Sequence, residues 1–143
     1  IPLHCLKIAD QEPMSNFKAV KGNNDYGLSY PNELVINAGQ EQLYLTHGHL
    51  QRVNFSLTPL MLTGQEKGAS IVCYGHTHQL GAVYDHQMLI INPGSISFPR
   101  GEYAKLGGTF AIIDAQPERF IVDYYNREIE AVPELHCEFR RQK

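Results

Sequence analysis

Two histidines separated by one residue, His76 and His78, are the strongest candidates for chemistry in this sequence. They follow the apolar run 71–74, which predicts a buried strand, and Gly75, where the backbone can turn without steric cost. The pair would therefore lie at the carboxyl end of a strand, where open sheets commonly bind ligands. Two imidazoles this close commonly bind one metal ion or two adjacent ions, and the alternative is a pair of solvated loop histidines.

A second histidine pair repeats this arrangement earlier in the chain. His47 and His49 follow the apolar run 43–45, which also predicts a strand. The repetition favours a shared metal site over solvated loops. Alternatively, His49 could contact a phosphate or protonate a leaving oxygen instead of binding a metal.

A loop rich in Gly, Asn and Asp, residues 21–25, could add oxygen ligands to such a site. It follows the run 17–20, which predicts a short strand, and it carries Asn23 and Asp25. An ordinary turn is the alternative, since Asn and Asp favour turns for local reasons.

A second polar loop, residues 92–101, also follows a predicted strand. Its Gly and Ser residues could offer backbone N–H groups to an anion, and Arg100 could add a fork-shaped donor. A surface loop with a solvated arginine is the alternative.

The composition is that of a globular protein with its own core. The 143 residues are 43% hydrophobic and 19% charged, with a net charge of −3. Because no Lys/Arg stripe is present, we expect no nucleic-acid-binding surface. The three cysteines are widely spaced, which predicts neither a zinc ribbon nor a disulfide framework. A reducing cytoplasm is the simplest location, and no apolar run is long enough to cross a membrane.

Three hairpins and one helix are expected to position the polar loops. Hairpin strands are predicted at 33–37 and 42–46, at 80–84 and 88–91, and at 109–114 and 120–125, with a further strand at 70–74. Helical spacing of apolar residues predicts a helix over 54–67 that ends at Gly68. These elements suggest two stacked sheets with helices outside.

The polar clusters could converge on one edge of the stack, because each follows a predicted strand. Neutral imidazoles and an amide oxygen, without thiolates, suit divalent Mn, Fe, Ni, Co or Zn. Two adjacent metal ions serve phosphoester hydrolysis, because they clamp phosphate oxygens and turn a bridging water into hydroxide.

Four motifs occur in order: 22–25 (GNND), 46–49 (THGH), 75–78 (GHTH) and 92–95 (NPGS). Together they resemble the calcineurin-like metallophosphoesterases, in the YfcE-like phosphodiesterase branch. The resemblance covers about residues 17–114. It implies an α/β fold, a four-layer α/β/β/α sandwich of two mixed β-sheets with a dinuclear metal centre.

The resemblance implies metal ligands at four positions. Asn23, His47 and His76 match ligands of the second metal, and His78 matches a ligand of the first. Two divalent ions are implied, with manganese favoured and zinc, nickel, iron or cobalt as alternatives. The implied substrate is a small-molecule phosphodiester.

The resemblance also implies three catalytic residues. His49 and Arg100 would lie close enough to meet phosphate, and Asp25 matches a residue that usually lies behind the metal ligands. Many relatives carry a histidine as general acid where Asn24 stands, and an amide cannot do that work.

Two family motifs are missing. The family opens with a strand ending in Asp-x-His, and this strand is absent; the later Gly-Asp is also absent, because residues 4–5 (HC) run into 6–7 (LK). We therefore expect one metallophosphoesterase domain over residues 1–143 that is incomplete at its N-terminus. The alternative explanation is a degenerate member that has lost its first metal site.

Two classes of function follow from these observations. The first is a divalent-metal-dependent phosphodiesterase that uses a metal-activated bridging hydroxide. The second is a non-catalytic binding scaffold, like the retromer subunit that shares this fold. A zinc hydrolase of the metallo-β-lactamase type is a weaker third, since residues 47–51 (HGHLQ) lack the required Asp and final His. The oligomeric state, including a homo-oligomer, stays open.

Overall fold

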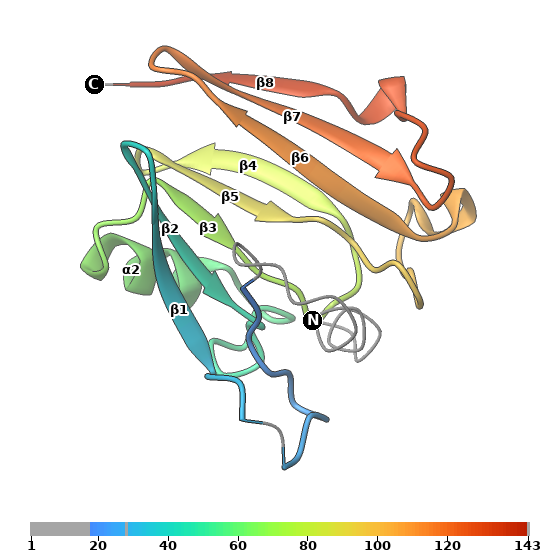
Figure 1. Cartoon of the computed structure of the whole chain (residues 1–143), viewed down its shortest axis with the longest axis horizontal. Helices are drawn as coiled ribbons and strands as arrows, with labels where there is room; N and C mark the ends of the chain where they lie inside the picture. Colours follow the sequence, from blue (N-terminus) through green and yellow to red (C-terminus); the bar gives the residue numbers. More distant parts are fainter. Residues whose placement is uncertain (1–17, 28, 143) are drawn as a thin grey trace.

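In the part of the chain that the structure describes, two β-sheets face each other and one α-helix lies against the outer face of the first sheet (Figure 1). This computed structural model describes residues 18–27 and 29–142. In chain order the described elements are β1 (Glu33–Ala38), β2 (Glu41–Thr46), α2 (Thr58–Glu66), β3 (Ile71–Cys73), β4 (Gly81–Asp85), β5 (Met88–Asn92), the 3₁₀ turn η1 (Ala104–Leu106), β6 (Thr109–Ala115), β7 (Arg119–Asn126), the 3₁₀ turn η2 (Pro133–Leu135) and β8 (Cys137–Arg140). None of the helices in these described ranges is long and apolar enough to span a membrane.

The first sheet is mixed and has the strand order β1-β2-β3-β5-β4. Its three central strands, β2, β3 and β5, run parallel to one another, whereas β1 and β4 are antiparallel to their neighbours. Parallel strands are normally covered on both faces, which explains why β3 and the first four residues of β5, 88–91, are continuous apolar runs. All three central strands therefore end at the same edge of the sheet.

Alternate residues of the central strands fill two separate cores. Val72 on β3 packs with Leu60 of α2 on one face of the sheet. Ile71 on the same strand packs with Leu89 and Phe120 between the two sheets. Burying a side chain of this size contributes about 1.5–3 kcal/mol, so both faces of β3 help to fix its register.

The second sheet is antiparallel, in the order β6-β7-β8, and it turns one face of β7 towards the first sheet. Its last strand leads into Arg141, whose guanidinium forms two hydrogen bonds of 3.0 and 2.8 Å with the Glu41 carboxylate. The same guanidinium lies 4.3 Å from the centre of the Phe120 ring. Bidentate Arg–carboxylate pairs are geometrically specific, so this contact fixes the C-terminal end of the second sheet to the start of β2.

The predicted hairpins and two-sheet α/β sandwich are confirmed, with strand ends shifted by one or two residues. Within the described residues the first sheet is mixed, whereas the second sheet is antiparallel throughout and carries no α-helix on its surface. The short strand β8 was not predicted, because its four residues alternate polar and apolar side chains too briefly to form a pattern.

The predicted helix 54–67 begins late. It starts at Thr58, because residues 50–55 form turns, and the Ser56 hydroxyl accepts a hydrogen bond from the Thr58 N–H at 3.1 Å. Phe55, which lies in the turns before the helix, is 82% exposed. The predicted end is confirmed, since Gly68 follows the helix with φ 69°.

The predicted strand at 17–20 is wrong for its described part, since residues 18–20 adopt no strand. Ala19 and Val20 are nevertheless buried, so this segment packs as irregular chain. Phe17 and the expectations for residues 4–7 lie outside the described residues.

Gly64 of α2 offers a test of this packing. A Cβ atom there would lie 2.8 Å from the Val72 Cγ2 and 3.1 Å from the Met88 Sδ. We expect Gly64→Ala to lower the free energy of unfolding, because overpacking typically costs about 1–3 kcal/mol and outweighs the roughly 1 kcal/mol of helix propensity that alanine gains. Urea unfolding measures the change.

The matched control is Gln65→Ala, an exposed position of the same helix. Its free energy of unfolding should stay within about 0.5 kcal/mol of the parent protein. A Gly64→Ala variant more stable than the parent would contradict the tight contact between α2 and the first sheet.

Candidate functional site

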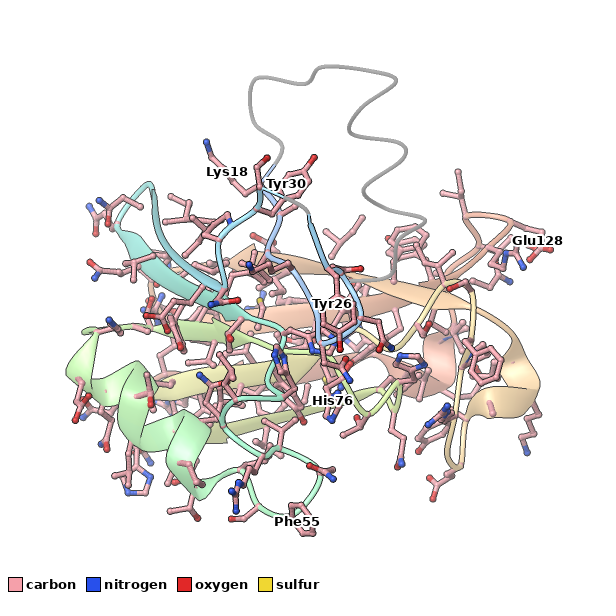
Figure 2. The ribbon with its side chains drawn as sticks, turned by 90° about the horizontal axis from the view of Figure 1, so that it is seen from below. Lys18, Tyr26, Tyr30, Phe55, His76 and Glu128 are labelled. Atoms are coloured by element: carbon pink, nitrogen blue, oxygen red, sulfur yellow. The ribbon has the colours of Figure 1, made fainter. Side chains whose placement is uncertain are left out.

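The parallel strands deliver both histidine pairs to one edge of the first sheet. His47 follows β2 directly, and His76 follows β3 after a short turn. The two loops touch, because the Gly75 N–H donates a hydrogen bond of 2.9 Å to the His47 carbonyl. Figure 2 views this edge from below and shows His76 near its centre. The predicted convergence of the two histidine loops is therefore present in the structure.

Three imidazole rings form a cluster at this edge. The ring centre of His47 lies 5.0 Å from that of His49 and 5.1 Å from that of His76. The ring centres of His49 and His76 are 6.1 Å apart. The Nδ1 atoms of His47 and His49 are 3.0 Å apart, so one carries a proton and the other accepts it. The chain thus gathers three imidazoles at one edge of the sheet.

The cluster favours neutral imidazoles. Burial, reinforced by His49, His76 and His78, lowers the pKa of His47 to about 3. Burial also lowers the pKa of His49 and, together with its histidine neighbours and the Arg100 charge, the pKa of His76. Neutral imidazole is the form that binds metal ions, so these side chains are ready to act as ligands at neutral pH.

The loop 21–25 packs directly against His47. Asp25 is only 6% exposed, and its Oδ2 accepts a hydrogen bond of 2.6 Å from the Gly22 N–H. A Cβ atom on Gly22 would lie 3.0 Å from the His47 ring, so only glycine allows this approach without displacing the ring. Asp25 therefore shapes the loop around the imidazole, and Asn23 lies exposed on the same loop.

His78 is held by the loop that follows β5. Its Nδ1 lies 2.8 Å from the Phe98 carbonyl oxygen. A carbonyl only accepts, so the Nδ1 donates and the neutral ring keeps its lone pair on Nε2. Arg100 is next to this contact: its N–H donates to the His78 carbonyl at 3.0 Å, and its guanidinium lies 5.2 Å from the centre of the Phe98 ring.

A cavity of about 600 Å³ opens beside the cluster, between the first sheet and β6. Five of the seven predicted site residues line it: Asn23, Asp25, His47, His76 and His78. The other two are adjacent rather than lining, since His49 contacts the His47 ring and Arg100 rests on Phe98. The size of this cavity suits a small-molecule ligand.

The loop 92–101 does not offer its amides as freely as the sequence predicted. The Gly94 N–H donates to the Asn92 side-chain oxygen at 2.9 Å, and the Phe98 N–H donates to the Ser95 hydroxyl at 3.0 Å. These two N–H groups therefore already donate hydrogen bonds within the loop and are not free to bind an anion. Sequence reasoning missed Asn92 as a site residue; the signal was a polar side chain ending the apolar run 88–91.

The donor types at this edge fit a divalent metal ion, because neutral imidazoles and an amide oxygen are borderline ligands. The arrangement supplies only part of a ligand set: within residues 18–27 and 29–142, no three His, Cys, Asp or Glu side chains are arranged to hold one ion. The histidines of this edge would therefore need other donors, such as the amide oxygen of Asn23, to complete the coordination of a metal.

Comparison with known proteins adds an independent finding. The sequence pattern of the calcineurin-like phosphoesterase superfamily domain matches residues 4–118. The probable metallophosphoesterase YsnB of Bacillus subtilis is 29% identical over 136 residues, which cover 93% of this chain and 79% of that protein.

Solved structures agree with this match. A conserved uncharacterized protein of Streptococcus pneumoniae, described as a predicted phosphoesterase, is 39% identical with a TM-score of 0.82, over 85% of this chain and 69% of that chain. Vacuolar protein sorting 29 from Cryptosporidium parvum is 17% identical with a TM-score of 0.74, over 99% of this chain and 77% of that chain. At that identity, the second likeness shows the fold alone.

The burial of His47 leads to a prediction about pH. In the metal-free protein, the imidazole of His47 should stay neutral far below pH 6.5, because burial lowers its pKa to about 3. His136, whose pKa is raised by hydrogen bonds to Asp123 and Glu138, should protonate above pH 6.5. Imidazole nitrogen NMR resonances followed from pH 8 to pH 5 measure both, and a His47 midpoint near 6.5 would contradict the burial.

The sign of the effect on stability follows from the same shift. The unfolded chain binds a proton at this imidazole below about pH 6.5, whereas the folded protein does so only near pH 3. Between these two pKa values the unfolded state therefore binds more protons than the folded state. The metal-free protein should lose stability as the pH falls from about 6.5 towards about 3.

Proposed function

Because the chain belongs to the calcineurin-like phosphoesterase superfamily, we propose that it is a divalent-metal-dependent phosphodiesterase acting at the carboxyl edge of the first sheet. One observation carries the proposal: the His47, His49 and His76 rings cluster within 6.1 Å of one another beside a cavity of about 600 Å³. Neutral imidazoles beside a ligand-sized cavity are suited to binding a metal and a small substrate together.

In this proposal, Asn23, His47 and His76 hold one metal ion and His78 contributes to a second, with manganese as the favoured metal. Bound metal would supply Lewis acidity towards phosphate oxygens and a hydroxide nucleophile at neutral pH. The chain itself keeps the imidazoles neutral by burial, and it directs the lone pair of His78 to Nε2 through the Phe98 carbonyl.

The remaining predicted residues act around these ligands. Asp25 holds the Gly22 backbone against the His47 ring, which helps to fix that ring. In the proposal His49, in contact with His47 through Nδ1, would bind phosphate through its other ring nitrogen. Because burial lowers its pKa, protonating the leaving oxygen is the weaker of its two candidate roles at neutral pH. Arg100 supplies positive charge near His76, which favours an anionic substrate.

We place the reaction in the cytoplasm and expect a small-molecule phosphodiester as substrate. The two described cysteines, Cys73 and Cys137, are free thiols, and free thiols are typical of a reducing compartment. The cavity is large enough to enclose a small diester, and its lining combines imidazoles with apolar side chains such as Ile96 and Phe110. This combination suits a diester whose leaving group is partly apolar.

The proposal is tested with bis(p-nitrophenyl) phosphate as a generic diester, assayed with and without Mn²⁺. His47→Ala and His76→Gly should lose at least about 100-fold in turnover, the upper end of the cost of disturbing even an outer partner of a metal ligand. Glycine is chosen at position 76 because its φ of 68° is left-handed. The melting temperature of the parent protein should rise with Mn²⁺, and that of His76→Gly should not.

The matched control is His86→Gly. His86 also has a left-handed φ, of 50°, but it lies in the β4–β5 turn at the opposite end of β5. This variant should keep full Mn²⁺-dependent turnover. Equal turnover in His76→Gly and the parent protein would contradict the proposed enzyme.

A parent protein without Mn²⁺-dependent turnover would favour a second candidate, a non-catalytic scaffold of the same fold. The observation in its favour is the incomplete ligand set within the described residues. A scaffold also needs an exposed apolar surface. Leu50 and Phe55, which follow His47 and His49 in the chain, are largely exposed. A folded parent protein that shows no turnover, and whose melting temperature does not rise with Mn²⁺, would identify this case.

A further inference from the structure

The side chain of Asn92, at the end of β5, is fully buried and makes hydrogen bonds in two directions. Its Nδ2 donates to the Gly75 carbonyl at 3.3 Å and to the Thr77 hydroxyl at 3.1 Å. Its Oδ1 accepts from the Gly94 N–H at 2.9 Å. One amide therefore joins the turn that carries His76 to the loop that follows β5.

The turn that Asn92 holds is strained. His76 and His78 have φ angles of 68° and 59°, in the left-handed region that residues with a Cβ rarely adopt. The hydrogen bonds from Asn92 meet this turn at Gly75, just before His76, and at Thr77, between the two histidines. Strained backbone persists only where the surroundings over-determine it, and the Asn92 amide supplies that constraint.

Asn92 is itself fixed from the second sheet. The buried hydroxyl of Tyr124, on β7, donates a hydrogen bond of 3.0 Å to the Asn92 carbonyl oxygen. Hydrogen bonds therefore hold the Asn92 carbonyl oxygen, the side-chain NH₂ and the side-chain oxygen, and these bonds restrict rotation of the side chain.

From these contacts we propose that Asn92 is a positioning residue that fixes the His76–Thr77–His78 turn in its left-handed conformation. The inference rests on the proposed function, because the reason to fix this turn is to aim two metal-binding imidazoles. Asn92 touches neither substrate nor metal; it acts through the Gly75 carbonyl and the Thr77 hydroxyl. Partners that orient metal ligands in this way typically account for 10–100-fold in metal affinity.

The test changes the partner first, because a substituted Asn92 is buried and could compromise folding. Thr77→Val keeps the branched shape and removes the hydroxyl that Asn92 bonds, whereas Thr77→Ser keeps the hydroxyl and is the matched control. Mn²⁺ affinity, measured by the electron paramagnetic resonance signal of free Mn²⁺, should fall about 10-fold in Thr77→Val and change less than about twofold in Thr77→Ser.

A second readout needs no metal. In the metal-free Thr77→Val protein, the NMR resonances of the Asn92 side-chain NH₂ and of the His76 and His78 rings should shift together, while those of His136 stay unchanged. Thr77→Ser should reproduce the parent spectrum. Ring resonances of Thr77→Val that superimpose on the parent spectrum would overturn the proposal.

A third variant separates Asn92 from the other partner of this hydroxyl, the Gln79 N–H, which donates to it at 3.2 Å. Asn92→Asp keeps Oδ1 and removes both donors. If Asn92 acts through Thr77, the two substitutions should not add. The double variant Asn92→Asp with Thr77→Val should bind Mn²⁺ no more than about twofold more weakly than the single variant with the larger loss of affinity. Losses that multiply would overturn the coupling, and the NH₂ resonance in Thr77→Val decides the question if Asn92→Asp does not fold.

The two readouts also separate this inference from the proposed function. A parent protein that binds no Mn²⁺ would contradict the metal-dependent enzyme, while the ring resonances of the metal-free variants would still decide whether Asn92 fixes the turn.

Discussion

The parallel alignment of β2, β3 and β5 is the constraint on which the site depends. Parallel strands must be joined by a crossover, and the connection that contains α2 returns the chain so that β3 ends beside β2. The loops after these strands then meet at one edge, where the Gly75 N–H bonds the His47 carbonyl. Without this pairing, the two histidine motifs would be ordinary loops at unrelated places.

Burial at that edge gives the imidazoles their chemistry. His47 is 7% exposed. Desolvation, together with the charge that neighbouring histidines would carry when protonated, lowers the pKa of such a ring. The surrounding loops supply orientation: Asp25 shapes the loop against His47, and Asn92 holds the turn of His76 and His78. The second sheet takes part through Tyr124, so the two-sheet architecture supports the geometry of the site as well as the core.

Much of the fold was predictable, because β-branched and apolar runs such as 71–73 carry a strong local signal. The candidate site was predictable to the level of residue types and their place after strands. The strand order was not, since pairing between β3 and β5 depends on long-range packing rather than on local pattern. Nor was the role of the loop 92–101: whether the Gly94 N–H faces an anion or the Asn92 side chain is decided by tertiary contacts.

The central claim is that the imidazoles at the carboxyl edge of the first sheet bind a divalent metal. Crystals of the protein grown with Mn²⁺ and measured near the manganese absorption edge would test it most directly. The account predicts an anomalous difference peak bonded to the rings of His47 and His76. A map with no peak at this edge, or with manganese only at the exposed cluster around His136, would contradict it.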